Sequence, residues 1–455
     1  MKSDALGNHR QAKGISRRGF IGASLSAVTG LELFGGRARS AQAPSPPKSA
    51  AKIKEYRSLG RTGFKVSDIS FGGGDLTNPP VLAAALDAGI NYIDTAEHYM
   101  RGNSERSIGE VLKTRDRKSV FLTTKLNLTF AKAATKQDIK DRFLKCLERL
   151  QTDYADCLMA HMCTLAQVKH EPYHEVIREL KAEGKVRFSG LSNHGADYSI
   201  HGNLSDPMDQ VVLAAAEDGR FDVVLFVYNF IKTDMGERIL QACKAKGMGT
   251  TLMKMNIAKT VENEKQMFQT YEERFKAQGK ELPERLKNLK VFTEERSAQT
   301  EAFLKKHGLQ GPEQARDAGI KFCLSHPDVH SVCPTMNTFE DVEAFVALSG
   351  KRLDSRERVL LAEYKDVYGP FYCRHACGQC EAACPHGVPV NSIMRFDHYF
   401  QAQKREKTAM AEYASLGPNN AGGCADCAGH CEKACPYGVP IQGLLVAADL
   451  RLTLA

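Results

Sequence analysis

A short apolar run that ends in polar residues is found at Gly89-Ile90-Asn91-Tyr92-Ile93-Asp94-Thr95-Ala96-Glu97-His98-Tyr99. Its β-branched and aromatic residues predict a buried strand over 92–96, with Asp94 toward the end and Tyr99 in the following loop. Similar runs recur along the chain and alternate with amphipathic stretches whose apolar residues are spaced by three and four. The other runs cover residues 66–73, 119–126, 154–162, 186–193, 221–229, 248–255 and 329–336. Eight strands alternating with helices predict an α/β fold, a closed parallel (β/α)8 or TIM barrel.

The barrel is expected to occupy residues 52–350. Clear amphipathic helices are predicted at 137–150, 173–185 and 238–246. The seventh connection, from residue 256 to about 311, is long and rich in Glu, Lys and Gln, which predicts inserted helices with solvated faces. A smaller, helical, cysteine-bearing domain is expected over 351–455.

Polar residues stand at the ends of three successive predicted strands. Asp94, Lys125 and His161 occupy these ends, and Tyr99 follows in the loop after the first of them. The carboxyl ends of barrel strands face the active site in barrels of this type. Each residue alone has a structural explanation, as a helix cap, a solvated rim residue or a core histidine. Their joint placement at one end of one barrel predicts an active site.

Residues 53–350 resemble the aldo/keto reductase family, because the quoted stretch and the following Ser104-Glu105 match its signature. The resemblance implies that Tyr99 is the general acid that protonates a carbonyl oxygen. Lys125 would lower the pKa of that phenol, and Asp94 would position Lys125 by ion pairing. His161 would orient the carbonyl or relay a proton. The hydride would come from a nicotinamide, because no side chain can donate one.

The nicotinamide site of the family is matched only in part. Ser192 and Asn193 end the fifth strand and match the pair that holds the carboxamide in the family. Leu225 stands where the family usually has Gln, which removes one hydrogen bond. Thr335 and Asp341 align with the Lys and Arg that many relatives use for the 2′-phosphate of NADP, and a carboxylate there would repel a phosphate. The cofactor is therefore expected to be NAD or NADP, with NAD favoured.

Eight of the 14 cysteines lie in two short motifs after residue 372. The motifs are Cys373-x3-Cys377-x2-Cys380-x3-Cys384-Pro385 and Cys424-x2-Cys427-x3-Cys431-x3-Cys435-Pro436. Both continue as Gly-Val-Pro, so the region is an internal duplication. Four thiols within so few residues are typical of a metal site and not of a disulfide framework. The other six cysteines stand singly in apolar segments and are expected in the core.

Each motif resembles the bacterial ferredoxin pattern C-x2-C-x2-C-x3-C-P with one inserted residue. The resemblance implies two [4Fe–4S] clusters in a ferredoxin-like dicluster domain, each cluster taking its fourth ligand from the other motif. One cluster would be held by Cys373, Cys377, Cys380 and Cys435, and the other by Cys384, Cys424, Cys427 and Cys431. Two zinc sites with four cysteines each are the alternative. Zinc ribbons, however, usually pair two C-x2-C knuckles across a loop.

The first 43 residues are typical of a targeting segment. Arg17 and Arg18 precede Phe20 and a modest apolar stretch, and Ala41-Gln42-Ala43 forms a small-x-small cleavage pattern. This order resembles a twin-arginine signal peptide and implies recognition by the twin-arginine export machinery. The expected location is the periplasm or the cell exterior, with membrane anchoring if the segment is not cleaved. A Pro/Ser/Ala-rich linker follows at 44–51.

Composition narrows the remaining function classes. Residues 1–43 contain seven Lys/Arg and two Asp/Glu, so most of the formal charge of +8 belongs to the targeting segment. No basic run interleaved with aromatics follows, which argues against nucleic-acid binding. The sequence predicts an exported oxidoreductase that interconverts a small-molecule carbonyl and alcohol and has a redox partner protein. The alternative is a non-catalytic redox-sensing, electron-transfer or binding module on a retained barrel fold.

The targeting interpretation gives the first testable prediction. Replacing Arg17 and Arg18 with Lys should leave the protein cytoplasmic and unprocessed, because the arginine pair is read by the export receptor. Cell fractionation and the mass of the N-terminal peptide measure this. Unchanged periplasmic recovery of a shortened chain would refute the interpretation of residues 1–43.

Overall fold

The computed structural model describes residues 51–129, 134–195, 197–199, 202–204, 206–255, 262–403 and 405–453. The predicted targeting segment and residues 44–50 of the linker lie outside this range. Residues 46–455 group into one compact unit. Among the described residues, no helix is long and apolar enough to cross a membrane.

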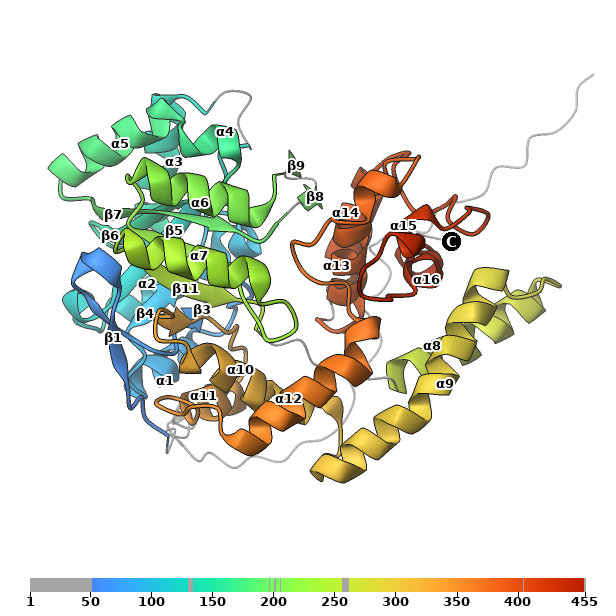
Figure 1. The fold of residues 1–455 in the computed structure, drawn as a ribbon. Coiled ribbons are helices and arrows are strands. Elements are labelled where there is room, and N and C mark those ends of the chain that lie inside the picture. Colours follow the sequence, from blue (N-terminus) through green and yellow to red (C-terminus); the bar gives the residue numbers. More distant parts are fainter. Residues whose placement is uncertain are drawn as a thin grey trace, which may run out of the picture. The chain divides into compact units, whose positions relative to one another are not determined.

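Eight parallel strands build the central sheet. They are β3 (Phe71–Gly72), β4 (Tyr92–Asp94), β5 (Phe121–Leu126), β6 (Ala155–Ala160), β7 (Val186–Asn193), β10 (Val223–Val227), β11 (Gly249–Met253) and β12 (Ser331–Val332). The sheet order is β12-β11-β10-β7-β6-β5-β4-β3 (Figure 1). Parallel bridges Ile69–Val332 and Gly72–Thr335 join the two edges and close the barrel. The predicted barrel is confirmed, and each of the eight apolar runs contains one of its strands.

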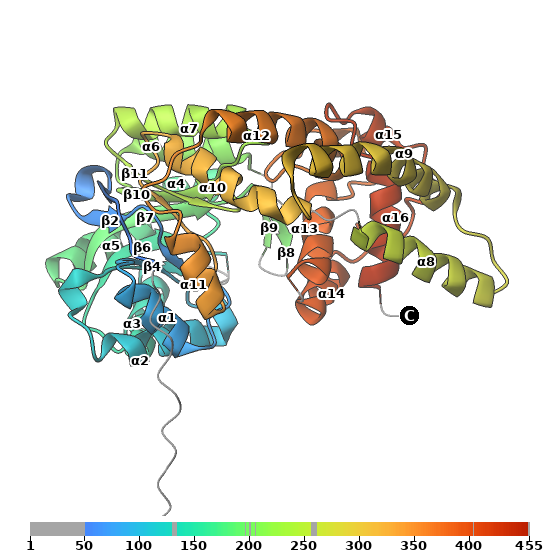
Figure 2. The ribbon, with the colours of Figure 1, turned by 90° about the horizontal axis from the view of Figure 1, so that it is seen from below.

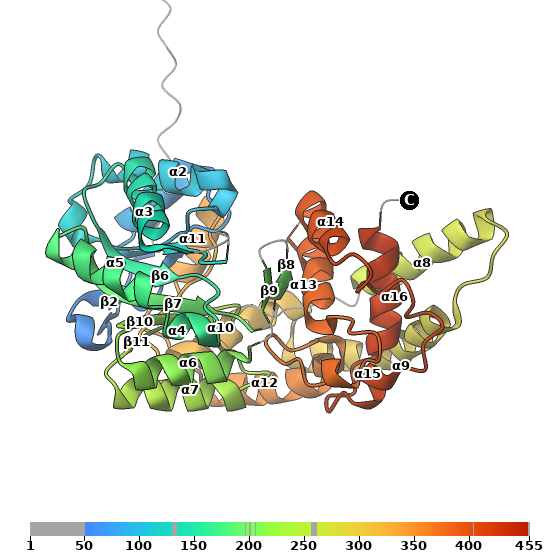
Figure 3. The same ribbon diagram turned by 90° about the horizontal axis from the view of Figure 1, so that it is seen from above.

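Each strand is followed by a helix that packs outside the sheet, as Figures 1 and 3 show. These helices are α1 (Pro79–Asp87), α2 (Asn103–Leu112), α3 (Lys136–Leu150), α5 (Glu171–Ala182), α6 (Met208–Asp218), α7 (Asp234–Ala245), α10 (Arg316–Ser325) and α11 (Phe339–Val346). Shorter elements in the connections are η2 (Tyr99–Gly102), η3 (Arg117–Ser119), α4 (Leu165–Val168), β8 (Asp197–Ser199) and β9 (Gly202–Leu204). The three helices predicted from periodicity correspond to α3, α5 and α7.

A hairpin closes the end of the barrel where the strands begin. It consists of β1 (Tyr56–Ser58), η1 (Gly60–Thr62) and β2 (Lys65–Ser67). Leu59 and Val66 pack with barrel-interior residues such as Phe121 and Leu225. Gly60 has a φ of 49°, and a Cβ there would lie 2.3 Å from the backbone N of Gly249, so only glycine fits. With this end filled, only the opposite end of the barrel can present functional groups.

The long seventh connection forms the two helices α8 (Glu262–Ala277) and α9 (Glu284–His307), followed by η4 (Pro312–Ala315). Helices were predicted here, but with only solvated faces. Phe268, Tyr271, Leu286 and Leu289 are buried and share a hydrophobic cluster with the C-terminal helices. Figure 2 shows α9 alongside that region. The few apolar residues among the Glu and Lys make one face of each helix apolar, so the insertion supports the cysteine-bearing region.

The cysteine-bearing region is helical, as expected. It contains α12 (Ser355–Tyr368), η5 (Gly369–Phe371), η6 (Glu381–Ala383), α13 (Val390–Gln401), α14 (Glu406–Ser415), α15 (His430–Lys433) and α16 (Ile441–Leu452). The duplication is visible in the backbone, because α13 and α16 each begin directly after the Gly-Val-Pro that follows a motif. In both helices the proline is the N-cap residue.

The cysteine-bearing region contacts loops that follow the barrel strands. A Cβ on Gly195, two residues after β7, would lie 2.3 Å from the Cα of Ala376, inside the first motif. Lys254 Nζ, after β11, donates to Tyr399 OH at 3.3 Å, and Lys232 Nζ, after β10, lies 3.3 Å from Tyr437 OH. The first cysteine motif therefore lies against the same end of the barrel as the predicted active-site residues.

Candidate active site and four-cysteine sites

The structure brings the four predicted catalytic residues together. Strands β4 and β5 are hydrogen-bonded neighbours, which places Asp94 beside Lys125. Lys125 Nζ donates to Asp94 Oδ1 at 2.5 Å and to Thr95 O at 2.8 Å, and it lies 3.4 Å from Tyr99 OH. His161 follows β6, and its ring centroid is 5.6 Å from that of Tyr99. Lys125 is fully buried, whereas Tyr99 is partly exposed at the open end of the barrel.

Burial and charge oppose each other in this group. Burial acts to lower the pKa of Lys125, but the charge of Asp94 outweighs it and the pKa is raised. Burial raises the pKa of Tyr99, and the nearby Lys125 ammonium acts in the opposite direction. Lys125 thus has the predicted sign of effect, but burial is the larger effect. The phenol remains protonated at neutral pH, as a proton donor must be.

Residues beyond the predicted group also shape this site. His98 stacks on His161 with ring centroids 4.9 Å apart, and its ring meets that of Tyr99 edge to face. The sequence analysis gave His98 no role, although it directly precedes Tyr99. Met100 and Met162 have φ angles of 50° and 53°, an uncommon backbone conformation for non-glycine residues. Such residues directly follow Tyr99 and His161, so strained backbone is concentrated at this site.

Ser104 and Glu105 of the signature are fully buried and hold the scaffold of the site together. Ser104 Oγ donates to Gly73 O at 2.7 Å. Glu105 accepts from Thr124 Oγ1 and from Arg149 Nε, both at 2.6 Å. These bonds link α2 to β5 and α3, and thus fix the strand that carries Lys125.

The predicted nicotinamide pair ends β7, next to the catalytic group. Ser192 Oγ accepts from Met162 N at 3.3 Å, and Asn193 Nδ2 donates to Cys163 O at 2.8 Å. Leu225 is buried in the barrel interior and adds no hydrogen bond there. Asp341 accepts backbone N–H groups from residues 337 and 338 in the N-terminal cap of α11. Its carboxylate therefore has a structural role.

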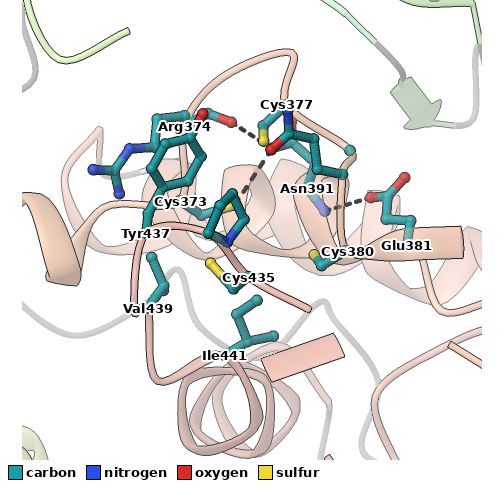
Figure 4. A pocket seen from close by; sticks show the side chains of 13 residues that line it. Cys373, Arg374, Cys377, Cys380, Glu381, Asn391, Cys435, Tyr437, Val439 and Ile441 are labelled. Atoms are coloured by element: carbon teal, nitrogen blue, oxygen red, sulfur yellow. Dashed lines mark hydrogen bonds between the residues drawn. The ribbon is translucent and has the colours of Figure 1, made fainter. Parts of the chain in front are cut away.

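Four cysteines from both motifs line one pocket in the C-terminal region, with about 330 Å³ of empty space (Figure 4). They are Cys373, Cys377, Cys380 and Cys435. The last belongs to the second motif, so the chain crosses between motifs as in the predicted grouping. Arg374 and Tyr437 also line the pocket, and the guanidinium carbon lies 3.9 Å from the ring centroid.

The other four cysteines are neighbours as well. Burial, followed by the charges of Cys431, Cys427 and Cys384, raises the pKa of Cys424 to about 12. Burial, followed by Cys384, raises the pKa of Cys431 to about 11. Cys384 of the first motif therefore lies with three cysteines of the second motif. None of the eight thiols is in a disulfide.

Equivalent polar contacts support the two groups. Asn391 N donates to Glu381 Oε1 at 2.7 Å, and Gln442 N donates to Glu432 Oε2 at 2.8 Å. The side chains of both amide residues then reach back to their motif. Asn391 Nδ2 donates to Arg374 O and lies 3.4 Å from Cys373 Sγ, while Gln442 Nε2 donates to Cys424 O at 3.0 Å. The duplication thus extends to the positions that order each motif.

Neither four-cysteine group is spaced for a single ion. Among the described residues, which include all eight cysteines, no group of three or more His, Cys, Asp or Glu side chains could hold a metal ion. A zinc ion requires four sulfurs at about 2.3 Å from one point. The pocket in Figure 4 instead has its thiols distributed around a hollow.

The comparison with protein families fits this geometry. The model of the aldo/keto reductase family matches residues 77–363, more than half of the chain. The protein belongs to the aldo/keto reductase family.

Curated relatives match the same part of the chain. Aldo-keto reductase YhdN of Bacillus subtilis is 32% identical over 215 residues, covering 44% of this chain and 61% of the relative. The NADH-specific methylglyoxal reductase of Escherichia coli is 29% identical over 196 residues, covering 38% and 56%. A putative voltage-gated potassium channel subunit beta of Schizosaccharomyces pombe is 29% identical over 218 residues, covering 43% and 60%. The matches thus span about half to three fifths of these relatives.

Among solved structures, an aldo/keto reductase from Klebsiella pneumoniae in complex with NADP and acetate is 20% identical. It covers 69% of this chain and 96% of its own, with a TM-score of 0.47.

The buried Lys125–Asp94 pair gives a prediction on stability. Lys125→Met should lower the free energy of unfolding by about 3–5 kcal/mol, because it leaves the Asp94 carboxylate buried without a counter-charge. Asp94→Asn in the same chain should recover most of that loss. Urea unfolding of wild type, both single variants and the double variant measures the coupling. A double variant no more stable than Lys125→Met would contradict the assignment.

Proposed function

We propose that this protein is an exported oxidoreductase that reduces a small carbonyl compound by nicotinamide hydride transfer and holds two [4Fe–4S] clusters. The observation that carries the enzymatic part is the contact of Lys125 Nζ with both Asp94 and Tyr99 OH at the open end of the barrel. This arrangement provides a neutral phenol next to a permanent positive charge. A solvated rim lysine or a simple core tyrosine would not be built in this way.

Tyr99 is the proton donor in the proposed reaction. As the carbonyl oxygen gains negative charge, the phenolic proton moves to it. The phenolate left on Tyr99 is stabilised by the Lys125 ammonium 3.4 Å away. Asp94 keeps that ammonium in place, and His161, whose ring faces Tyr99, orients the carbonyl oxygen. Each of these residues acts on the substrate oxygen, directly or through Tyr99.

A nicotinamide supplies the hydride when bound, and Ser192 and Asn193 would hold its carboxamide. Their position directly after the interior of β7 supports this role. NAD is favoured over NADP, because the cap of α11 holds Asp341 where a phosphate-binding cation would be needed. A relative whose printed name is NADH-specific methylglyoxal reductase is in accord with that preference.

The donor sets of the two four-cysteine groups fit [4Fe–4S] clusters. Each group supplies four thiols, with three from one motif and one from the other, as in two-cluster ferredoxins. The spacing around a hollow supports a group larger than a zinc ion. These clusters carry single electrons to and from a redox partner protein.

Export through the twin-arginine machinery is part of the proposal. The motif around Arg17 and Arg18 supports it. Proteins exported by this route commonly acquire their cofactors before they cross the membrane. Periplasmic location implies that the nicotinamide is retained by the protein, since free nicotinamide is scarce outside the cytoplasm.

A non-catalytic sensing or binding module is the second candidate. Leu225 favours it, because the barrel offers an apolar side chain where a carboxamide partner is expected. A relative named as a putative potassium channel subunit beta matches the same residues. The intact group around Tyr99 favours the enzyme.

The proton-donor role of Tyr99 can be tested directly. Tyr99→Phe should lower the single-turnover rate of carbonyl reduction by at least about 10²-fold, because only the phenolic proton is removed. Nicotinamide affinity, measured by fluorescence titration, should change little. Tyr56→Phe is the matched control, since Tyr56 is 45% exposed and far from the site in the N-terminal hairpin. Equal rates in wild type and Tyr99→Phe would favour the sensing module.

The cluster proposal predicts about eight Fe per chain and a broad absorbance near roughly 400 nm that bleaches with dithionite. Metal analysis and the visible spectrum of the purified holoprotein measure both. Stoichiometric zinc without a visible band would refute iron–sulfur clusters and favour the zinc alternative.

A further inference from the structure

The two four-cysteine groups have different electrostatic surroundings. We call Cys373, Cys377, Cys380 and Cys435 the barrel-side site, and Cys384, Cys424, Cys427 and Cys431 the distal site. The thiols themselves are similarly buried: Cys380 is 8% exposed, Cys424 7% and Cys431 6%. Solvation of the ligands therefore does not distinguish the sites, and nearby charge becomes the main difference.

Two arginines surround the barrel-side site from within its own repeat. Arg374 is 4% exposed, lines the pocket and packs on Tyr437. Arg395 is 8% exposed, and its Nη2 donates to Cys373 O at 2.8 Å. The equivalent positions of the second repeat hold Ala425 and Val446, which carry no charge.

A third cation reaches the barrel-side site from the barrel. Lys232 follows β10, its side chain is only 7% exposed, and its Nζ lies 3.3 Å from Tyr437 OH in the pocket wall. Asp234, its ion-pair partner at 3.3 Å, is 55% exposed, so water screens that interaction. The positive charge of Lys232 is therefore directed largely at the pocket.

The distal site has fewer cations and more acids. Arg285 of α9 donates to Cys427 O at 2.9 Å. Asp449 raises the pKa of Cys424, after burial and the neighbouring thiols, and Asp426 lies inside the second motif where the first has His375. His430 and Lys433 on α15 are exposed to solvent, where their charges are screened. Glu381 and Glu432 occupy equivalent places, so they do not distinguish the sites.

We propose that the barrel-side site has the higher reduction potential of the two, set by Arg374, Arg395 and Lys232, so that an electron in the cysteine-bearing region rests beside the barrel. The inference rests on the proposed [4Fe–4S] clusters. Each cluster accepts one electron and gains one negative charge. Cations close to a cluster stabilise that added charge, and carboxylates destabilise it.

The charges on Lys232 and Arg285 provide a matched test, because neither residue flanks a cysteine and each reaches a different site. Midpoint potentials are measured on the holoprotein by redox titration with dithionite, following the electron paramagnetic resonance of the reduced clusters. Lys232→Met should lower the higher potential by at least about 59 mV, a tenfold change for a one-electron couple. Arg285→Met should lower the other potential. Lys232→Arg should keep the wild-type value.

Lys244→Met is the control for loss of one positive charge, since Lys244 is on α7 with a side chain 66% exposed. It should move neither potential. Two equal potentials, or a shift of the lower one in Lys232→Met, would overturn the inference while leaving the clusters in place. A holoprotein without iron would overturn the cluster proposal together with this inference, and metal analysis of the same sample separates these results.

Discussion

The buried ion pair between Lys125 and Asp94 is the constraint around which the active end of the barrel is organised. An ammonium without contact to water is tolerated only if it is paired and hydrogen-bonded. Here Asp94 Oδ1, Thr95 O and the phenol of Tyr99 surround it. The pairing holds only if adjacent strands keep their register, which the buried Glu105 enforces through its bonds to Thr124 and Arg149. A catalytic requirement and a folding requirement are therefore met by the same atoms.

The cysteine-bearing region is joined to the barrel through functional loops and not through a separate linker. Ala376 in the first motif lies against Gly195, whose N–H donates to the side chain of Asn193 at 2.7 Å. A change at this contact would reach the predicted nicotinamide pair on one side and the Cys377 thiol on the other. The insertion α8–α9 stabilises the region from the opposite direction through Leu286 and Leu289.

Much of the fold could be predicted because parallel barrel strands are buried on both faces and are read as continuous apolar runs. The predicted catalytic group was also found together, since residues at successive strand ends must meet. The stacking of His98 on His161 could not be predicted, because it depends on the left-handed backbone of Met100 and Met162. The packing of α8 and α9 was missed, because their few apolar residues are diluted by charge. The structural use of Asp341 as a helix cap was missed because alignment to a family position says nothing of local hydrogen bonds.

The crossed grouping of the cysteines has a consequence for how the chain is assembled. The barrel-side group contains Cys435, so it is incomplete until the second motif has been synthesised, long after the barrel strands. The distal group in turn needs Cys384 from the first motif. Neither repeat can mature alone, and truncation within the second repeat would remove a thiol from both groups. Completion of the two groups therefore becomes a late, joint checkpoint in biogenesis, reached only by a chain that is already almost fully folded.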